Sequence, residues 1–102
     1  MYLCGMKQIS FEELQAWKAS GTDFALLDVR EYEEHEAFNI GGQLIPLGEI
    51  FKRKDEIGSL DKPIVVYCKR GIRSQIAIQR LEQYFSEAQF YNLEGGIYHL
   101  NL

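Results

Sequence analysis

The most constraining feature of the sequence is an unbroken apolar run, Ile64 to Tyr67, that ends directly on Cys68. The run is β-branched and aromatic and contains no alternating polar residue, which is typical of a parallel strand buried on both faces. After a polar loop, apolar or small residues recur at helical spacing: Ser74, Ile78, Leu81 and Phe85. The sequence therefore predicts a strand, a loop and a helix that begins near Ser74, with Cys68 at the carboxyl end of the strand.

The loop after this strand has the chemistry of an anion site. Ligands of open α/β sheets bind at the carboxyl ends of the strands, where the next helix presents free N–H groups and its positive dipole end. Lys69, Arg70 and Arg73 lie within five positions of Cys68 and favour a thiolate over a thiol. Gly71 lets successive amides converge on one anion. We interpret Cys68 as a nucleophile rather than an inert buried thiol, because an inert thiol has no use for three neighbouring cations.

Length and charge limit the class of protein. A chain of 102 residues that is 46% hydrophobic is long enough for one domain with one core. The formal charge of −4 argues against nucleic acid as the main partner. Two cysteines make no disulfide framework, and we expect neither a signal peptide nor a membrane-spanning segment, since the sequence contains no apolar run of that length. We expect a cytoplasmic protein without a membrane partner.

The first residues stand apart from the rest of the chain. Residues 1–5 carry no periodic signal, and we expect them to be a flexible N-terminal extension of a single domain over residues 6–102. Cys4 lies in this extension. A resolving or relay role for its thiol is one interpretation, but we favour an incidental cysteine.

Strands alternate with helices along the remainder of the chain. Strands are predicted at residues 7–9, 24–27, 64–67 and 89–93 and within 40–46, and helices after Ser10, at 31–37, at 47–53 and after Ser74. Such alternation implies an α/β fold with a parallel sheet of about five strands and helices on both faces. In the helix over 47–53 we expect Leu47, Ile50 and Phe51 to face inward.

A carboxylate and a guanidinium, Asp28 and Arg30, follow another predicted strand and are candidates for supporting the site. We favour a structural role in which they bind backbone amides and pair with charges such as Glu31 or Glu34. His35 is flanked by acidic residues, and we expect it to be solvated. Because the cysteines and histidines lack the close pairing of zinc sites, we expect no metal and no other cofactor.

Three segments resemble, in the same order and spacing, the motifs of single-domain rhodaneses: Leu27 to Glu31, Cys68 to Ser74 and Leu93 to Ile97. The resemblance runs over nearly the whole chain from Met6. It implies the rhodanese α/β fold and a thiosulfate sulfurtransferase that forms a persulfide on Cys68. Thiosulfate or a similar anion would be the donor, and cyanide, a thiol or a protein would be the acceptor. By motif, the substrate-binding residues are Lys69, Arg70, Gly71, Ile72, Arg73 and Ser74.

The same resemblance leaves other functions to be weighed. Phosphatases of the cell-cycle dual-specificity type share this fold, but their loop is one residue longer than the four residues between Cys68 and Arg73. A catalytically silent binding module is disfavoured because the cysteine is present. Residues 39–46 are similar to rhodanese domains fused behind ubiquitin-activating-like adenylyltransferases. That similarity implies sulfur relay to a small carrier protein for thiamine or molybdopterin synthesis as an alternative.

The chain also departs from the family pattern at two places. Residues 38–40 read Phe-Asn-Ile where many rhodaneses have Gly-His-Ile, and Tyr98 follows the last glycine motif where a tryptophan is expected. The first departure overlaps the segment over residues 39–46, whose similarity implies a protein acceptor.

Overall fold

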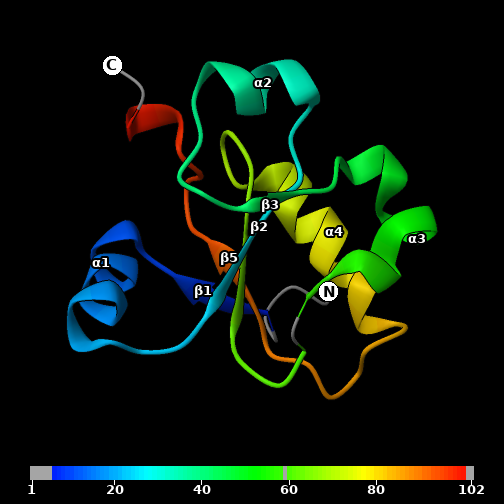
Figure 1. Ribbon diagram of the computed structural model, residues 1–102, viewed down its shortest axis with the longest axis horizontal. Helices are drawn as coiled ribbons and strands as arrows, with labels where there is room; N and C mark the ends of the chain where they lie inside the picture. Colours follow the sequence, from blue (N-terminus) through cyan, green and yellow to red (C-terminus); the bar gives the residue numbers. More distant parts are fainter. Residues whose placement is uncertain (1–5, 59, 101–102) are drawn as a thin grey trace.

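A computed structural model describes residues 6–58 and 60–100 of the chain. The predicted extension with Cys4 lies outside the described residues. The centre of the molecule is a parallel sheet in the order β1-β5-β4-β2-β3 (Figure 1). Its strands are β1 (Lys7–Ile9), β2 (Ala25–Asp28), β3 (Gln43–Leu44), β4 (Ile64–Tyr67) and β5 (Phe90–Leu93). The five-stranded parallel sheet confirms the predicted fold class.

Helices connect the strands and cover both faces of the sheet. The α-helices are α1 (Phe11–Ser20), α2 (Tyr32–Ala37), α3 (Ile50–Arg53) and α4 (Ile72–Glu82). Short 3-10 turns are η2 (Leu47–Glu49), η3 (Lys54–Glu56) and η4 (Tyr98–Leu100). Helix α1 begins with a capping box between Ser10 and Glu13 and ends at Gly21, whose φ of 76° closes the last turn.

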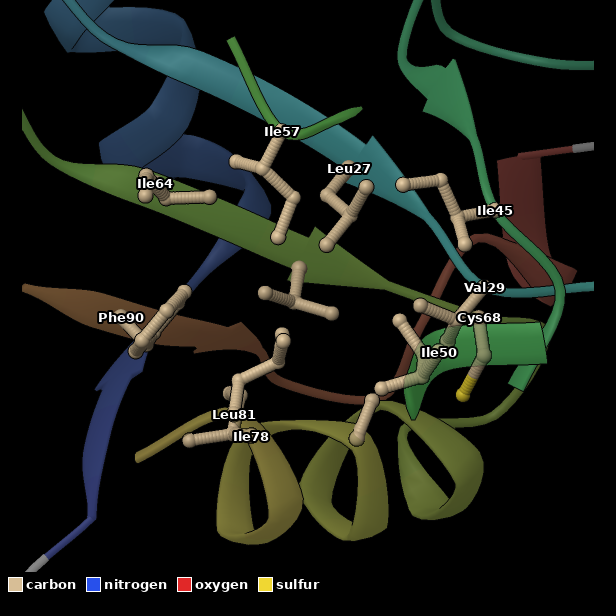
Figure 2. Packing of buried hydrophobic residues seen from close by; sticks show 12 residues of the cluster. Leu27, Val29, Ile45, Ile50, Ile57, Ile64, Cys68, Ile78, Leu81 and Phe90 are labelled. Carbon is tan, nitrogen blue, oxygen red and sulfur yellow. The ribbon is translucent and has the colours of Figure 1, made fainter. Parts of the chain in front are cut away.

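The central strand β4 divides the core into two clusters. Ile64 and Val66 pack on one side, in the cluster covered by α3 and α4, which Figure 2 shows from close by. Val65 and Tyr67 pack on the other side, with residues such as Leu14 of α1. All four β4 side chains are fully buried. An apolar run without alternation therefore does form a strand buried on both faces, because each face is covered by helix.

Two details of the helices differ from the predictions. The segment 47–53 splits into η2 and α3, and this change of helical phase turns Phe51 outward, where it is 63% exposed and packs against the ring of Tyr84. Helix α4 begins at Ile72 instead of near Ser74. Its N-cap is Gly71, with a φ of 92°. The left-handed glycine turns the chain into the helix early, which makes the loop after β4 short.

Candidate active site

Cys68 lies directly after β4, at the carboxyl edge of the sheet, and its side chain is fully buried. Figure 2 shows it beside Val29 and Ile50 at one end of the larger core cluster. Two backbone amides point at the sulfur: the N–H of Gly71 donates to Sγ at 3.1 Å and the N–H of Ser74 at 3.3 Å. Donors in this arrangement stabilise negative charge on sulfur, because the first turn of α4 brings its free N–H groups to one point.

The hydroxyl of Ser74 is the third polar group at the sulfur. Its Oγ lies 3.3 Å from Cys68 Sγ and donates its proton to Asn92 Oδ1 on β5. Asn92 in turn donates from Nδ2 to Gln8 Oε1 at 2.9 Å. Since a hydroxyl has one proton, Ser74 Oγ can only accept from the Cys68 thiol in this arrangement. On ionisation the sulfur keeps its two backbone donors.

Asn92 is a residue that the sequence analysis missed. It is 1% exposed in the middle of an otherwise apolar strand, and it links the hydroxyl beside the sulfur to β1. The available signal was its residue type, because asparagine is depleted in strands and a buried amide requires a specific partner.

The three cationic side chains of the loop have different surroundings. Arg73 forms a two-point ion pair with Glu34 of α2, at 2.8 and 3.0 Å. The hydrogen bonds from Arg73 lower the pKa of Glu34 to about 2. Lys69 and Arg70 lie over the ring of Tyr98, with Arg70 Cζ 4.0 Å from its centroid. Neither has a carboxylate partner among the residues that the structure describes.

A small cavity of about 170 Å³ opens at this loop. It is lined by Cys68, Lys69, Arg70, Ile72 and Arg73. Ile72 is 64% exposed, so the mouth of the cavity combines an apolar side chain with unpaired positive charge. The remaining two residues of the predicted cradle, Gly71 and Ser74, contribute their backbone amides at the sulfur.

The chain after β5 holds the loop from the other side. Ile97 N donates to Cys68 O at 3.1 Å, and Tyr98 N donates to Lys69 O at 2.8 Å. This close approach needs Gly96, whose φ is 66° and where a Cβ atom would lie 2.3 Å from Lys69 O. The glycine pair of the third motif therefore lets the terminal segment run against the loop.

Asp28 and Arg30 form a separate buried network at the end of β2. Asp28 Oδ1 accepts from Arg30 N and Nε at 2.9 and 3.0 Å. Asp28 Oδ2 lies 2.9 Å from Arg30 Nη2 and 2.8 Å from His35 Nδ1. Arg30 Nη2 also donates to Phe38 O. The predicted bond to a backbone amide is present, but the predicted pairing with Glu31 or Glu34 was wrong, because Asp28 itself pairs with Arg30 and Glu34 pairs with Arg73.

The prediction that His35 is solvated was also wrong. Its side chain is 23% exposed and lies against the buried carboxylate of Asp28. The acidic neighbours in sequence did not decide its environment, since residues 34, 35 and 36 point in different directions from one short helix. In the part of the chain that the structure describes, no cluster of three or more His, Cys, Asp or Glu side chains could hold a metal ion. No helix in that part is long and apolar enough to cross a membrane.

Known proteins are similar to this chain in both sequence and fold. Residues 10–101 match the model of the rhodanese-like domain. The thiosulfate sulfurtransferase GlpE of Coxiella burnetii is 37% identical over 92 residues, which cover 88% of this chain and 82% of that protein. The Mycobacterium tuberculosis protein named "Probable adenylyltransferase/sulfurtransferase MoeZ" is 38% identical over 93 residues, which are 87% of this chain and 23% of that protein.

The structural comparison agrees with the sequence comparison. A crystal structure of a rhodanese-like domain protein from Staphylococcus aureus superposes with a TM-score of 0.81 at 27% identity, covering 90% of this chain and 88% of that chain. The matching segment of the family model includes both the loop after β4 and the glycine pair after β5. The chain belongs to the rhodanese-like domain family.

Proposed function

We propose that this protein is a sulfurtransferase that carries sulfane sulfur as a persulfide on Cys68. The observation that carries the proposal is the sulfur itself, which accepts two backbone N–H groups at the start of α4. Such donors stabilise both the attacking thiolate and the anionic persulfide that replaces it. The likeness to a protein named as a thiosulfate sulfurtransferase supports the same reaction class. A reducing compartment such as the cytoplasm suits a working thiol.

The donor that fits this site is thiosulfate or a similar small anion. The Cys68 thiolate attacks the outer sulfur of thiosulfate, the S–S bond of the donor breaks, and sulfite leaves with the electron pair. Lys69 and Arg70 favour such a dianion, because neither is neutralised by a carboxylate among the described residues. Gly71 and Ser74 supply amide donors, Arg73 adds a partly compensated charge, and Ile72 forms an apolar edge of the mouth.

The second step returns the enzyme to its starting state. An acceptor thiolate or cyanide attacks the outer sulfur of the persulfide, and the electron pair of the breaking S–S bond returns to Cys68. Electron pairs are conserved in both steps, so the cycle needs neither a metal nor a redox cofactor.

A protein acceptor is the second candidate for this step. It is favoured by the likeness to MoeZ, whose printed name joins an adenylyltransferase to a sulfurtransferase. We propose sulfur relay to a small carrier protein as the alternative to transfer to a small acceptor. A panel of acceptors discriminates between the two, since efficient use of cyanide or low-molecular-weight thiols with no transfer to an adenylated carrier protein would contradict the relay.

Phosphatase activity fits the loop less well. The amides of Gly71 and Ser74 already lie at hydrogen-bond distance from Sγ, so the ring of the loop closes around one sulfur atom. A persulfide adds a single sulfur to this thiol, whereas a phosphoryl group adds a phosphorus with three oxygens and needs a wider loop of donors. An aryl phosphate assay tests this alternative directly.

The experiment that tests the proposal is the intact mass of the protein after incubation with thiosulfate and removal of the excess. We expect a gain of one sulfur atom that cyanide removes, and no gain in Cys68→Ser. The serine variant should retain the fold, which circular dichroism checks. A folded wild-type protein that gains no sulfur, or a Cys68→Ser variant that still transfers it, would refute the proposed carrier.

A further inference from the structure

A second and larger cavity, of about 260 Å³, lies beside the loop after β4. Arg30, Glu34 and Lys69 form its charged wall, and Phe38, Ile97 and Tyr98 form much of its apolar wall. Lys69 also lines the cavity at Cys68. The two cavities are therefore neighbours that share one side chain, and the reaction as proposed above leaves the larger cavity unused.

Arg30 presents an unpartnered donor in this cavity. The residue is 5% exposed, and its Nε and Nη2 atoms donate to Asp28 and to Phe38 O. Nη1 has no acceptor in the described part of the chain. Every fully buried side-chain nitrogen or oxygen described there has a partner, so Nη1 is not fully buried. Arg30 lines the cavity, and Nη1 is the nitrogen of its guanidinium that is left to bind a ligand there.

The balance of charge around the cavity favours an anion. The charge of Arg30 is compensated by Asp28, which also contacts His35, and the charge of Glu34 is compensated by Arg73. Lys69, the other cation in the wall of the cavity, has no carboxylate partner among residues 6–58 and 60–100. A guanidinium edge and an ammonium group together match a carboxylate, which can accept from both.

We propose that this cavity is an acceptor subsite for a short thiol that carries a carboxylate. The carboxylate would bind Arg30 Nη1 and Lys69, and the hydrocarbon would lie against the apolar wall. The thiol would extend past Lys69 to the cavity at Cys68. This inference rests on the proposed function, since it names the class of acceptor for the same persulfide.

The transfer that this subsite serves is balanced without a further reactant. The acceptor thiolate attacks the outer sulfur of the Cys68 persulfide and forms a new S–S bond. The bond between that sulfur and Cys68 Sγ breaks, and its electron pair leaves Cys68 as a thiolate. The acceptor departs as a persulfide, and the carboxylate only positions it.

The kinetic test compares three thiols that differ in charge. Protein loaded with thiosulfate is mixed with 3-mercaptopropionate, 2-mercaptoethanol or 2-mercaptoethylamine at equal thiolate concentration, and loss of the persulfide is followed by intact mass. We expect the carboxylate-bearing thiol to react about tenfold faster than the neutral one, the effect of roughly one charge-assisted hydrogen bond. The amine should react most slowly. Equal rates for all three thiols would overturn the subsite.

Matched variants at Ala37 locate the effect in the cavity. Ala37 is an exposed cavity-lining residue at the end of α2 and takes no part in the loop at Cys68. Ala37→Glu should lower the rate ratio of 3-mercaptopropionate to 2-mercaptoethanol about fivefold relative to Ala37→Gln, which has nearly the same shape, because the added carboxylate repels the ligand at close range. Ala37→Lys should raise the ratio. The same ratio in all three variants would contradict the proposed location.

A binding measurement separates this inference from the proposed function. Cys68→Ser is titrated with 3-(methylthio)propionate, which carries the carboxylate but no thiol, and amide shifts are followed by NMR. We expect shifts at Ala37, Phe38 and Tyr98 that are absent with the uncharged methyl ester. If the variant shows these shifts but the folded wild-type protein gains no sulfur from thiosulfate, the carrier is refuted and the carboxylate site is kept. Normal loading and cyanide discharge without such shifts would refute the site and keep the carrier.

Discussion

Strands β2 and β4 are neighbours in the sheet and end at the same edge, but their ends use polar groups in opposite ways. At the end of β2 the carboxylate of Asp28 meets three nitrogens of Arg30 and one of His35. At the end of β4 the sulfur of Cys68 meets two backbone amides, and two of the three loop cations have no carboxylate partner among the described residues. The charges at the end of β2 therefore neutralise one another, whereas the loop at the end of β4 keeps a net positive charge.

The difference follows from the cost of burying charge. A buried carboxylate is tolerated only when ion pairs and hydrogen bonds replace water, so Asp28 is satisfied by Arg30 and His35, and only Nη1 of Arg30 is left without an acceptor among the described residues. A thiol is neutral until it ionises, so the β4 end can hold it with fixed backbone dipoles and keep its charged side chains for a ligand. Changes at β2 should therefore affect stability first, and changes at β4 should affect sulfur transfer first.

The largest effect on stability is expected for Asp28→Ala. The variant leaves the guanidinium of Arg30, which is 5% exposed, without its partner. Loss of one member of a buried pair costs about 3–5 kcal/mol, and urea unfolding measures it. Cys68→Ser is the contrasting variant, with an expected cost of about 1 kcal/mol or less. Equal losses in the two variants would remove the distinction between the two strand ends.

A smaller effect is expected where the terminal segment contacts the loop. Gly95 and Gly96 both have positive φ, but a Cβ atom at Gly95 meets nothing within 4 Å, whereas one at Gly96 lies 2.3 Å from Lys69 O. Gly95→Ala should cost about 1 kcal/mol for the left-handed backbone alone. Gly96→Ala should cost about 2 kcal/mol or more, because a clash with fixed backbone is added to the strained backbone conformation.

The pair of glycine variants also separates stability from transfer. Displacement of Lys69 O shifts the start of the loop, so Gly96→Ala should load sulfur from thiosulfate more slowly than Gly95→Ala at a temperature where both are folded. Unfolding curves and the mass assay measure the two properties. If Gly95→Ala slowed loading as much as Gly96→Ala, the close contact at Lys69 would not be what positions the loop.

The sequence was sufficient for features that depend on neighbours along the chain. The apolar run of β4 predicts a doubly buried strand, and the position of Cys68 after it predicts a thiol at the sheet edge. The features that it did not predict join distant segments. Arg73 and Glu34 are 39 residues apart, and His35 lies against Asp28 on the strand before its own helix. Pairing among several nearby acids and bases is decided by packing, which a linear pattern does not contain.

The smallest effect on stability is expected for Glu34→Gln. Glu34 is the residue that connects the end of β2 with the loop after β4. Glu34 lies on α2, after β2, and its ion pair with Arg73 reaches the loop after β4. Its pKa is lowered to about 2 from an ordinary value of 4.5, mainly by the hydrogen bonds from Arg73. Its contribution to stability is therefore complete above about pH 4.5 and is lost as the pH falls toward 2. At 30% exposure of the side chain, that contribution is about 1 kcal/mol or less.

Glu34→Gln should remove this acid-dependent part, so the stability gap between wild type and variant should narrow as the pH falls from 4.5 to 2. The exposed neighbour Glu33 forms no ion pair in the described part of the chain, so Glu33→Gln should show no such narrowing.

Glu34→Gln should also change sulfur loading. The substitution removes the carboxylate that neutralises Arg73 and so releases the charge of Arg73 toward the cavity at Cys68, and thiosulfate should load at lower concentration in this variant. A Glu34→Gln variant that lost stability at pH 7 without any gain in loading would show that Glu34 only holds Arg73 in place. The positive charge available to a ligand at the end of β4 would then come from Lys69 and Arg70 alone.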